Sequence, residues 1–388
     1  LMRKSILRRR QCVKSLIRLL GVLVSVAAAV IGGSSIPVLA SEGDDAGHAL
    51  FVQTNNPSGN AIAAYHRSSD GTLAYQASYS TGGLGGREAG AAADPLASQG
   101  SLVLAREGGL LLAVNAGSNT VSVFQVRGDR LRLNQVVWSG GQFPTGIAVH
   151  DDLVYVMDAG GQGSVSGYAI KGGRLQAIAN STRSLGLGGA NPPFFLSAPA
   201  EVGFTPDGAH LVVTTKTHNT VDVFTVGDEG RLSAQPVSNA VSGVPFAFLF
   251  DRAGRLVLNY AGPSSLQTFV IAANGTITPA GAAVSDGQPA LCWEIAARGF
   301  VYGGNAGGND ISQLRVNPDG SITLVNAIAA SGIPGAIDMA QAGGRFLYAE
   351  SEVSSSVHAF SIGSDGSLTA IQTVTVPDGS SLEGIATA

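Results

Sequence analysis

The sequence predicts an all-β protein, a seven-bladed β-propeller built from four-stranded antiparallel blades. Three observations predict it: a strand pattern that recurs seven times, X-Gly turns after most copies, and a surplus strand near the C-terminal end. The composition agrees, because 53 of the 388 residues are glycine and only 13% are charged. Such a composition favours many short strands joined by tight turns.

The recurring pattern is a short strand in which apolar residues alternate with small or polar ones, usually ending at an aromatic residue. Its starts are separated by 59, 44, 56, 45, 45 and 46 residues. A period near 45 that carries only strand patterns is typical of a propeller blade. The seven copies are Ile62–Tyr65, Val121–Phe124, Val165–Tyr168, Val221–Phe224, Leu266–Phe269, Ile311–Leu314 and Val357–Phe360.

Each copy lies in a similar frame. An apolar strand such as Leu110–Val114 precedes it, and a turn such as Asp365-Gly366 supplies the positive φ that a hairpin needs. A further strand then leads to a Gly-rich corner, often with a proline. These features place the blades near residues 49–80, 98–140, 144–184, 199–242, 245–286, 289–331 and 334–376.

The two ends of the repeat indicate how the ring closes. The first copy lacks an inner strand before it, and the last is followed by the surplus strand Leu382–Ala386. We therefore expect residues 382–386 to complete the first blade, which leaves no free sheet edge there. Two insertions, near Gly82–Gln99 and Ser184–Pro199, are predicted to be surface loops, where a propeller can place a functional lid.

Residues 1–40 differ from the rest and are predicted to be a secretory signal peptide. They carry seven basic and no acidic residues, an apolar run from Leu19 to Ile31, and small residues before a cleavage point after Ala40. A membrane anchor is the alternative, but a spanning helix needs about 20 apolar residues. Arg9-Arg10 only loosely resembles a twin-arginine signal. We expect residues 41–388 to be exported, as a secreted, periplasmic or cell-surface protein.

Removal of the signal changes the charge balance. With seven of the 23 Lys and Arg gone, 16 remain against 27 Asp and Glu, a formal charge of −11. This balance argues against nucleic acid or anionic lipid as a partner and against membrane binding after cleavage, since both partners need dense Lys and Arg. Cys292 becomes the only cysteine, which excludes an internal disulfide and a Cys-based metal site. We expect a monomer without metal or organic cofactor.

Three stretches carry a family resemblance: Val114-Asn115-Ala116-Gly117-Ser118-Asn119, Phe204-Thr205-Pro206-Asp207-Gly208 and Ala290-Leu291-Cys292-Trp293. They resemble the β-propeller lactonase-like family of bacterial 6-phosphogluconolactonases and fungal carboxymuconate cyclases, over roughly residues 48–388 and most closely its exported bacterial branch. The resemblance implies opening or closing of a lactone. Similar enzymes use His, Glu and Arg at one channel mouth, often from a Pro-His-Ala-His-like segment. This sequence has no such segment, so no catalytic residue is transferred.

The residues themselves nevertheless suggest a site at the central channel, where propellers bind ligands. Glu201, Glu294 and Glu383 each follow the start of a blade on otherwise uncharged inner strands. A carboxyl group in a dry channel has a raised pKa and can act as general acid or base; the alternative is that it is solvated or paired. Lys216 can hold a carboxylate substrate or an oxyanion beside Glu201. Glu201 and Lys216 are therefore the predicted catalytic pair, and Glu294 and Glu383 predicted binding residues.

Polar side chains also align just after the second strand of each copy, and these can bind a polyhydroxylated or anionic ligand. Turn capping is the alternative, because Asn tolerates the left-handed conformation. The aligned residues are Asn56, Asn115, Asp158, Thr215, Asn259, Asn305 and Ser351. Asn259 and Asn305 are predicted binding residues, as is His218, which follows Lys216 at a strand end.

Two functions remain open on the sequence alone. The first is a lactonase-like hydrolase or cycloisomerase that acts on a small lactone at the channel mouth. The second is a non-catalytic exported propeller that binds a small ligand, a glycan or a protein. No Gly-x-Ser-x-Gly elbow, P-loop or His-Glu-x-x-His motif supports another enzyme class.

Overall fold

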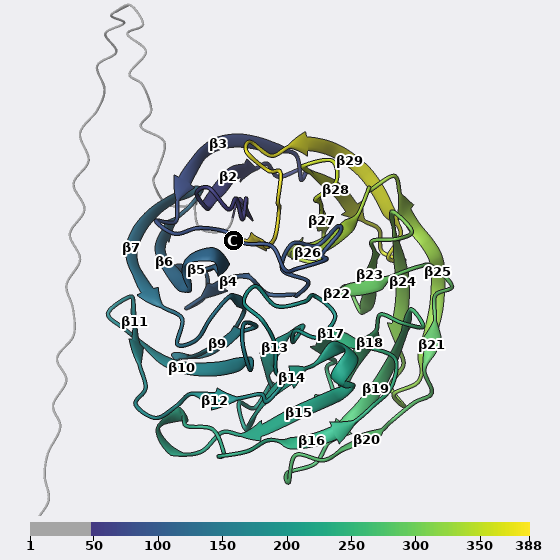
Figure 1. Cartoon of the computed structure of the whole chain (residues 1–388). Coiled ribbons are helices and arrows are strands. Elements are labelled where there is room, and N and C mark those ends of the chain that lie inside the picture. Colours follow the sequence, from purple (N-terminus) through teal and green to yellow (C-terminus); the bar gives the residue numbers. More distant parts are fainter. Residues whose placement is uncertain (1–47) are drawn as a thin grey trace, which may run out of the picture. The chain divides into compact units, whose positions relative to one another are not determined.

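The structure is a computed structural model and describes residues 48–388, which form seven antiparallel sheets arranged in a ring (Figure 1). The predicted seven-bladed propeller is confirmed. We number the blades 1 to 7 in chain order. The inner strands, which surround the channel, are β30 (Ile385–Thr387), β4 (Leu102–Ala105), β8 (Pro144–His150), β13 (Val202–Phe204), β17 (Pro245–Phe250), β22 (Leu291–Ala297) and β26 (Ala336–Ala342).

The second strands are apolar on both faces, because each is covered by the blades on either side. They are β1 (Ala49–Gln53), β5 (Leu110–Asn115), β9 (Leu153–Asp158), β14 (His210–Thr214), β18 (Leu256–Tyr260), β23 (Phe300–Asn305) and β27 (Phe346–Ser351). Every residue of β5, LLLAVN, is buried, and its neighbours pack into cores between the blades.

The third strands contain all seven copies of the recurring pattern. They are β2 (Ala61–Arg67), β6 (Thr120–Arg127), β10 (Ser164–Lys171), β15 (Thr220–Thr225), β19 (Ser265–Ile271), β24 (Asp310–Val316) and β28 (Ser356–Ile362). The period of the sequence is therefore the period of the blades.

The outer strands consist mostly of exposed and half-buried residues, as expected at the rim of the ring. They are β3 (Leu73–Ser80), β7 (Arg130–Trp138), β11 (Arg174–Ala177), β16 (Val237–Ala240), β20 (Ile277–Pro279), β25 (Ile322–Ser331) and β29 (Leu368–Thr375). Two short strands, β12 (Arg183–Ser184) and β21 (Val284–Ser285), extend blades 3 and 5, and the 3-10 helices are η1 (Ala116–Ser118), η2 (Lys216–His218) and η3 (Asp228–Gly230).

The predicted X-Gly turns also connect neighbouring blades. The Tyr302 hydroxyl of blade 6 donates a hydrogen bond of 2.7 Å to the Gly366 carbonyl of blade 7. Equivalent bonds reach the other predicted turn glycines from Tyr348 to Gly71, Tyr155 to Gly230, Asn239 to Gly275 and Thr268 to Gly320. The glycine of each of these turns has φ above zero. Its carbonyl oxygen accepts a hydrogen bond from the adjacent blade and so joins the two blades.

The ring closes as the sequence predicts. Strand β30 pairs with β1 through Leu50↔Thr387, Phe51↔Ala386 and Val52↔Ile385, so the C-terminal strand becomes the inner strand of blade 1. The regular strand begins at Ile385, three residues later than the predicted Leu382. Leu382 is still fully buried, in the core between blades 7 and 1.

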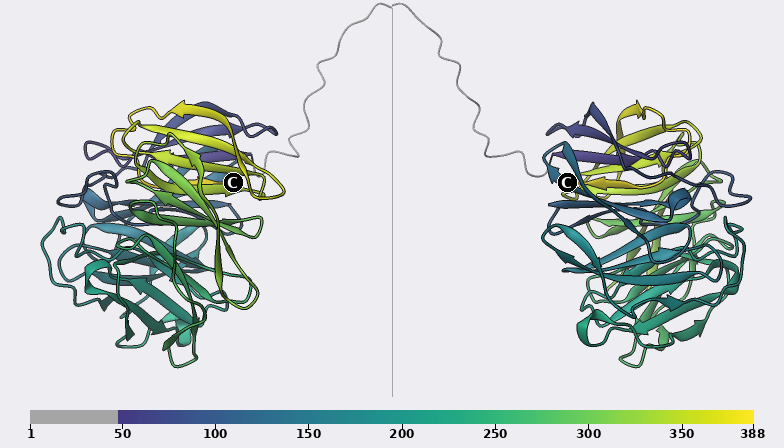
Figure 2. Two further views of the ribbon diagram at one scale, coloured as in Figure 1. Left: turned by 90° about the vertical axis from the view of Figure 1, so that its right-hand side faces the viewer. Right: turned by 60° about the vertical axis from the view of Figure 1, so that its left-hand side comes forward.

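The insertion at 82–99 is not the surface loop that its composition predicts. Residues 94–98 form a continuous buried stretch, and Glu88 is 1% exposed. The connection from β3 to β4 crosses the middle of the ring between blades 2 and 6 (Figure 1). Figure 2 shows the blades of the ring from the side. Much of the second insertion, by contrast, is exposed between Ser184 and Pro192.

The predicted signal peptide, residues 1–40, lies outside the described residues. Within residues 48–388, no helix is long and apolar enough to cross a membrane.

Candidate functional site

Buried acidic side chains gather where the inner strands begin. Glu201 stands directly before β13, Glu294 within β22, Asp338 within β26 and Glu383 shortly before β30. Glu350 joins them from the end of β27. The insertion at 82–99, which we call the lid, adds Glu88 and Asp94. The carboxylate cluster is therefore Glu88, Asp94, Glu201, Glu294, Asp338, Glu350 and Glu383, and all of them are buried except Glu201, which is half-buried.

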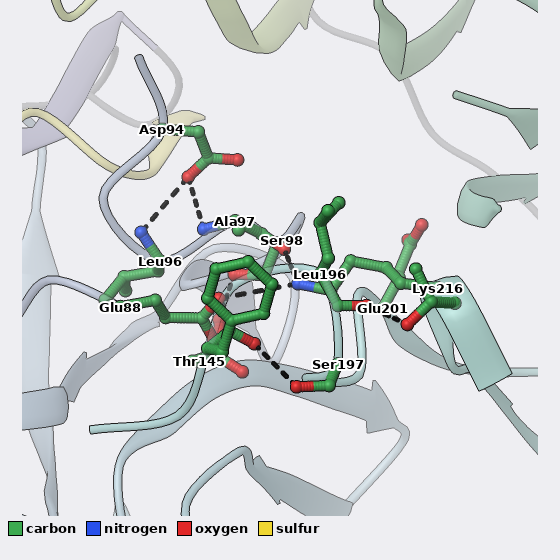
Figure 3. Close-up of polar contacts among 12 residues, drawn as sticks. Glu88, Asp94, Leu96, Ala97, Ser98, Thr145, Leu196, Ser197, Glu201 and Lys216 are labelled. Atoms are coloured by element: carbon green, nitrogen blue, oxygen red, sulfur yellow. Dashed lines mark hydrogen bonds and ion pairs between the residues drawn. The ribbon is translucent and has the colours of Figure 1, made fainter. Parts of the chain in front are cut away.

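The lid meets the cluster through Asp94. One carboxylate oxygen of Asp94 accepts hydrogen bonds from the backbone N–H groups of Leu96, at 3.1 Å, and Ala97, at 2.6 Å (Figure 3). The Leu96 N–H also donates to Oε2 of Glu383, at 3.0 Å. Burial raises the pKa of Glu383 well above its usual range, and the nearby Asp94 charge raises it further. Burial and the neighbouring charge thus both favour the protonated form of Glu383.

Glu201 of blade 4 and Glu294 of blade 6 are linked by one side chain, that of Gln99, and have different surroundings. Oε2 of Glu201 accepts a 2.6 Å hydrogen bond from the Phe248 N–H. The Gln99 side chain contacts both residues: its Nε2 donates to Glu201 at 3.4 Å, and its Oε1 accepts from the Glu294 N–H at 3.0 Å. Within the described part of the chain, neither carboxylate oxygen of Glu294 has a hydrogen-bond partner.

The pKa values of both groups are displaced in the same direction. Burial raises the pKa of Glu294 well above its usual range, the charge of Glu201 adds to the effect, and the backbone N–H of Leu249 opposes it. Burial also raises the pKa of Glu201, but the Phe248 N–H bond opposes the shift. Two nearby carboxyl groups do not ionise together easily, so the pair tends to hold one proton. Glu201, whose carboxylate accepts the 2.6 Å hydrogen bond from the Phe248 N–H, is the member better suited to carry the negative charge.

Lys216, the predicted catalytic partner of Glu201, contacts the lid. The Lys216 ammonium lies 3.5 Å from Oε2 of Glu88 and donates a 2.7 Å hydrogen bond to the Ala97 carbonyl (Figure 3). It also lies 5.7 Å from the centre of the Phe246 ring. Lys216 has φ 44°, which is uncommon for a residue other than glycine. The charge of Lys216 and its hydrogen bond are therefore used to hold the lid.

Further contacts fix the lid to the ring. The Trp293 indole N–H donates to the Ser98 carbonyl at 3.1 Å, and the Ser98 hydroxyl donates to the Thr145 carbonyl at 2.9 Å. Arg87 forms an ion pair of 2.5 Å with Glu352 of blade 7. The two insertions also pair with each other, because Ala89 forms a parallel bridge with Phe194. Both insertions therefore cover the same mouth of the channel.

The other predicted binding residues lie apart from this cluster or serve the blades. His218 is exposed, and its Nε2 lies 3.0 Å from the Leu187 carbonyl of the second insertion. The Asn305 amide donates to Asp310 and Ser312 of the next strand, both at 2.8 Å, as a capping residue does. Asn259 is fully buried, and its side-chain atoms have no hydrogen-bond partner among residues 48–388. Their roles in binding stay predictions.

Four acidic members of the cluster are not evident from the sequence. Asp338 does have a signal, since Pro334 precedes it by four residues as Pro289 precedes Glu294 by five, at equivalent blade starts. Glu350 is the penultimate residue of the second strand β27, and the alignment of the seven copies selects the next residue, Ser351. Glu88 and Asp94 stand in an insertion without periodicity, and no local pattern directs them inward.

Among the described residues, no group of three or more His, Cys, Asp or Glu side chains is arranged to hold a metal ion.

The comparisons with known proteins agree with this architecture. The sequence profile of the family described as "Lactonase, 7-bladed beta-propeller" matches residues 162–293, from blade 3 into blade 6. The resemblance to the lactonase-like propellers is confirmed. No curated protein sequence matches this chain significantly.

Solved structures extend the similarity of fold to most of the ring. The periplasmic gluconolactonase of Pseudomonas aeruginosa has a TM-score of 0.64 at 18% identity, over 86% of this chain and 98% of its own. A candidate 6-phosphogluconolactonase of Bacteroides uniformis has a TM-score of 0.67 at 16% identity, over 87% of this chain and 99% of its own. A protein from Lactobacillus plantarum has a TM-score of 0.65 at 20% identity, over 85% and 96% of the two chains. At these identities the likeness shows the fold.

Proposed function

We propose that this lactonase-like propeller is an exported enzyme that opens a lactone ring with water beneath the lid. The observation that carries the proposal is the pair formed by Glu201, which is half-buried, and Glu294, which is buried; Gln99 links the two carboxyl groups at one channel mouth, and their hydrogen bonding differs. A protonated and an ionised carboxyl group side by side supply the acid and the base that lactone hydrolysis needs. The periplasmic gluconolactonase among the similar folds supports both the reaction class and the export.

The two carboxyl groups have separate roles in this reaction. Glu201 reacts in its ionised form, which the Phe248 N–H stabilises, and takes a proton from water as the water oxygen attacks the lactone carbonyl. The carbonyl re-forms, the bond to the ring oxygen breaks, and protonated Glu294 gives its proton to that oxygen. The product is the open hydroxy acid. The lid must move to admit the substrate, since Asp94–Ser98 are buried in the mouth.

A panel of aliphatic and sugar lactones tests the proposal, with acid release followed in a pH-stat. We expect Glu201→Gln and Glu294→Gln each to lower kcat/KM by about 10²-fold or more. Asp222→Asn is the matched control, because Asp222 is also a buried carboxyl group but belongs to the third strand of blade 4. Full activity in both glutamine variants would refute the assignment.

A second function is favoured by how firmly the lid occupies the mouth. Lys216 and Trp293 both hold lid carbonyls, those of Ala97 and Ser98. If the lid does not open, the chain is a non-catalytic exported propeller that binds a small ligand, a glycan or a protein on one face. Absence of turnover across the lactone panel, together with calorimetric binding of a panel member, would favour this function.

A further inference from the structure

A groove between blades 5 and 6 lies at the opposite end of the channel from the lid. It encloses about 650 Å³ and is lined by the last residues of β17 and β22, where those inner strands turn back into β18 and β23. The end of β24 and the turn after it, Arg315–Pro318, form the remaining wall. Glu201 and Glu294 stand at the beginnings of inner strands, so this groove is separate from the carboxylate cluster.

The lining of the groove is strongly basic. It contains Arg252, Arg255, Arg298 and Arg315 and a single acidic residue, Asp251. Asp251 is already paired, with its carboxylate 2.7 Å from Nε of Arg255. Three arginines therefore remain without an ion-pair partner in the described part of the chain. In a protein predicted to carry a charge of −11 after signal cleavage, such a local excess of positive charge is unexpected.

Arg255 fixes the shape of the groove rather than its affinity. Besides Asp251, it donates hydrogen bonds of 3.0 Å to the carbonyls of Pro318 and Asn317. Those two carbonyls belong to blade 6, whereas Arg255 belongs to blade 5. The guanidinium group thus joins the two blades, and the walls of the groove are set before any ligand arrives, which lowers the cost of binding.

The remaining arginines are available to a ligand. The Arg315 guanidinium lies 4.6 Å from the centre of the Phe300 ring, a stacking that orients its donors. Arg252 and Arg298 are exposed, and Arg298 donates a long hydrogen bond of 3.5 Å to the Ile362 carbonyl. A planar guanidinium group binds carboxylate or phosphate oxygens in pairs, which makes arginine the preferred residue for such groups.

We propose that this groove binds a small molecule with at least two oxyanion groups, carboxylate or phosphate, held between Arg252 and Arg298 on one side and Arg315 on the other. A volume of about 650 Å³ fits a ligand of two or three small rings. The proposal is independent of lactone hydrolysis, because it uses none of the residues of the carboxylate cluster.

Isothermal titration calorimetry of the purified chain at low ionic strength tests the proposal. The probes are citrate and digalacturonate, which carry carboxylates, and pyrophosphate, which carries phosphates. We expect at least one probe to bind, and the tighter probe to define the oxyanion. The double variant Arg252→Gln and Arg315→Gln should weaken that binding at least tenfold, and added salt should weaken it in the wild type, because salt screens exposed charges.

The matched control is Arg127→Gln with Arg130→Gln, which removes the same charge from exposed positions on blade 2. Circular dichroism melting of both double variants checks that the ring is intact. The proposal is overturned if none of the three probes binds, or if the control weakens binding as much as the groove variant does. Unchanged lactone turnover in the groove variant would separate this site from the proposed active site.

Discussion

The Lys216 ammonium lies 3.5 Å from the Glu88 carboxylate, and the two side chains are 1% and 0% exposed. They come from segments more than a hundred residues apart: η2 of blade 4 and the lid. A buried ion pair costs desolvation, so it does not by itself imply high stability. It does mean that removal of one partner leaves the other charged and without a counterion. The pair therefore couples the lid to the ring.

Replacement of the lysine alone should destabilise the chain. We expect Lys216→Met to lower the free energy of unfolding by about 3 kcal/mol, because Glu88 and the Ala97 carbonyl lose their partner. The double variant Lys216→Met with Glu88→Gln should lose less than the sum of the two single variants. Urea unfolding of all four proteins gives the coupling. Additive losses would show that the pair contributes nothing to holding the lid.

The ring was accessible from the sequence because its signal is repeated. Seven copies, each with a third strand and a turn, leave little freedom in the number of blades, and the surplus strand indicates closure. The carboxylates at blade starts, Glu201, Glu294 and Glu383, were found in the same way. Glu88 and Asp94 were not, because their positions depend on partners such as Lys216 and Glu383 that are distant in the chain. The insertion at 82–99 occurs once, so the sequence contains no second copy with which it could be aligned.

The closing strand depends on a glycine that no other residue can replace easily. Gly384 has φ +104°, and a Cβ there would lie 2.3 Å from the Ser101 hydroxyl and 2.8 Å from Cβ of Leu102. We expect Gly384→Ala to destabilise the whole ring, by about 1–3 kcal/mol from backbone strain alone and more from the clash. Thermal melting followed by circular dichroism measures the effect.

Gly254 provides the matched control for the closing glycine. Gly254 has φ +77°, but apart from its chain neighbours no atom lies within 4 Å of the position that a Cβ would take. Gly254→Ala therefore introduces backbone strain but no steric clash. We expect a clearly smaller loss of Tm than for Gly384→Ala. Equal losses would mean that the close approach to Ser101 and Leu102 is unimportant for ring closure.

The ion pair between Arg87 and Glu352 should control the motion of the lid without controlling the stability of the ring. The Arg87 side chain is 35% exposed and the Glu352 side chain 9%, so water screens the pair from the Arg87 side; a glutamine at position 352 also keeps an oxygen that can accept a hydrogen bond from the guanidinium group. We expect Glu352→Gln to leave Tm nearly unchanged but to speed backbone hydrogen exchange in residues 87–91. Exchange at strand β5, which is fully buried, serves as the internal reference. Uniform acceleration across both segments would instead indicate loss of global stability.

Asp158 should make stability fall as the pH rises. Burial raises the pKa of its carboxyl group from 3.8 to about 7, although the 2.5 Å hydrogen bond from Ser139 opposes the shift. Between these two values the folded chain holds a proton that the unfolded chain has released. The folded state therefore binds more protons, and the free energy of unfolding decreases with pH across that window.

The variant Asp158→Asn isolates this effect from the other buried carboxyl groups, because it keeps an oxygen for Ser139 but does not titrate. At pH 4 we expect the wild type and the variant to have similar stability. Above pH 7 the variant should be more stable by about 4 kcal/mol, the free energy that corresponds to a shift of this size. Urea unfolding at pH 4, 6 and 8 measures the difference. A difference that stays constant from pH 4 to pH 8 would mean that Asp158 ionises at the same pH in the folded and unfolded chain.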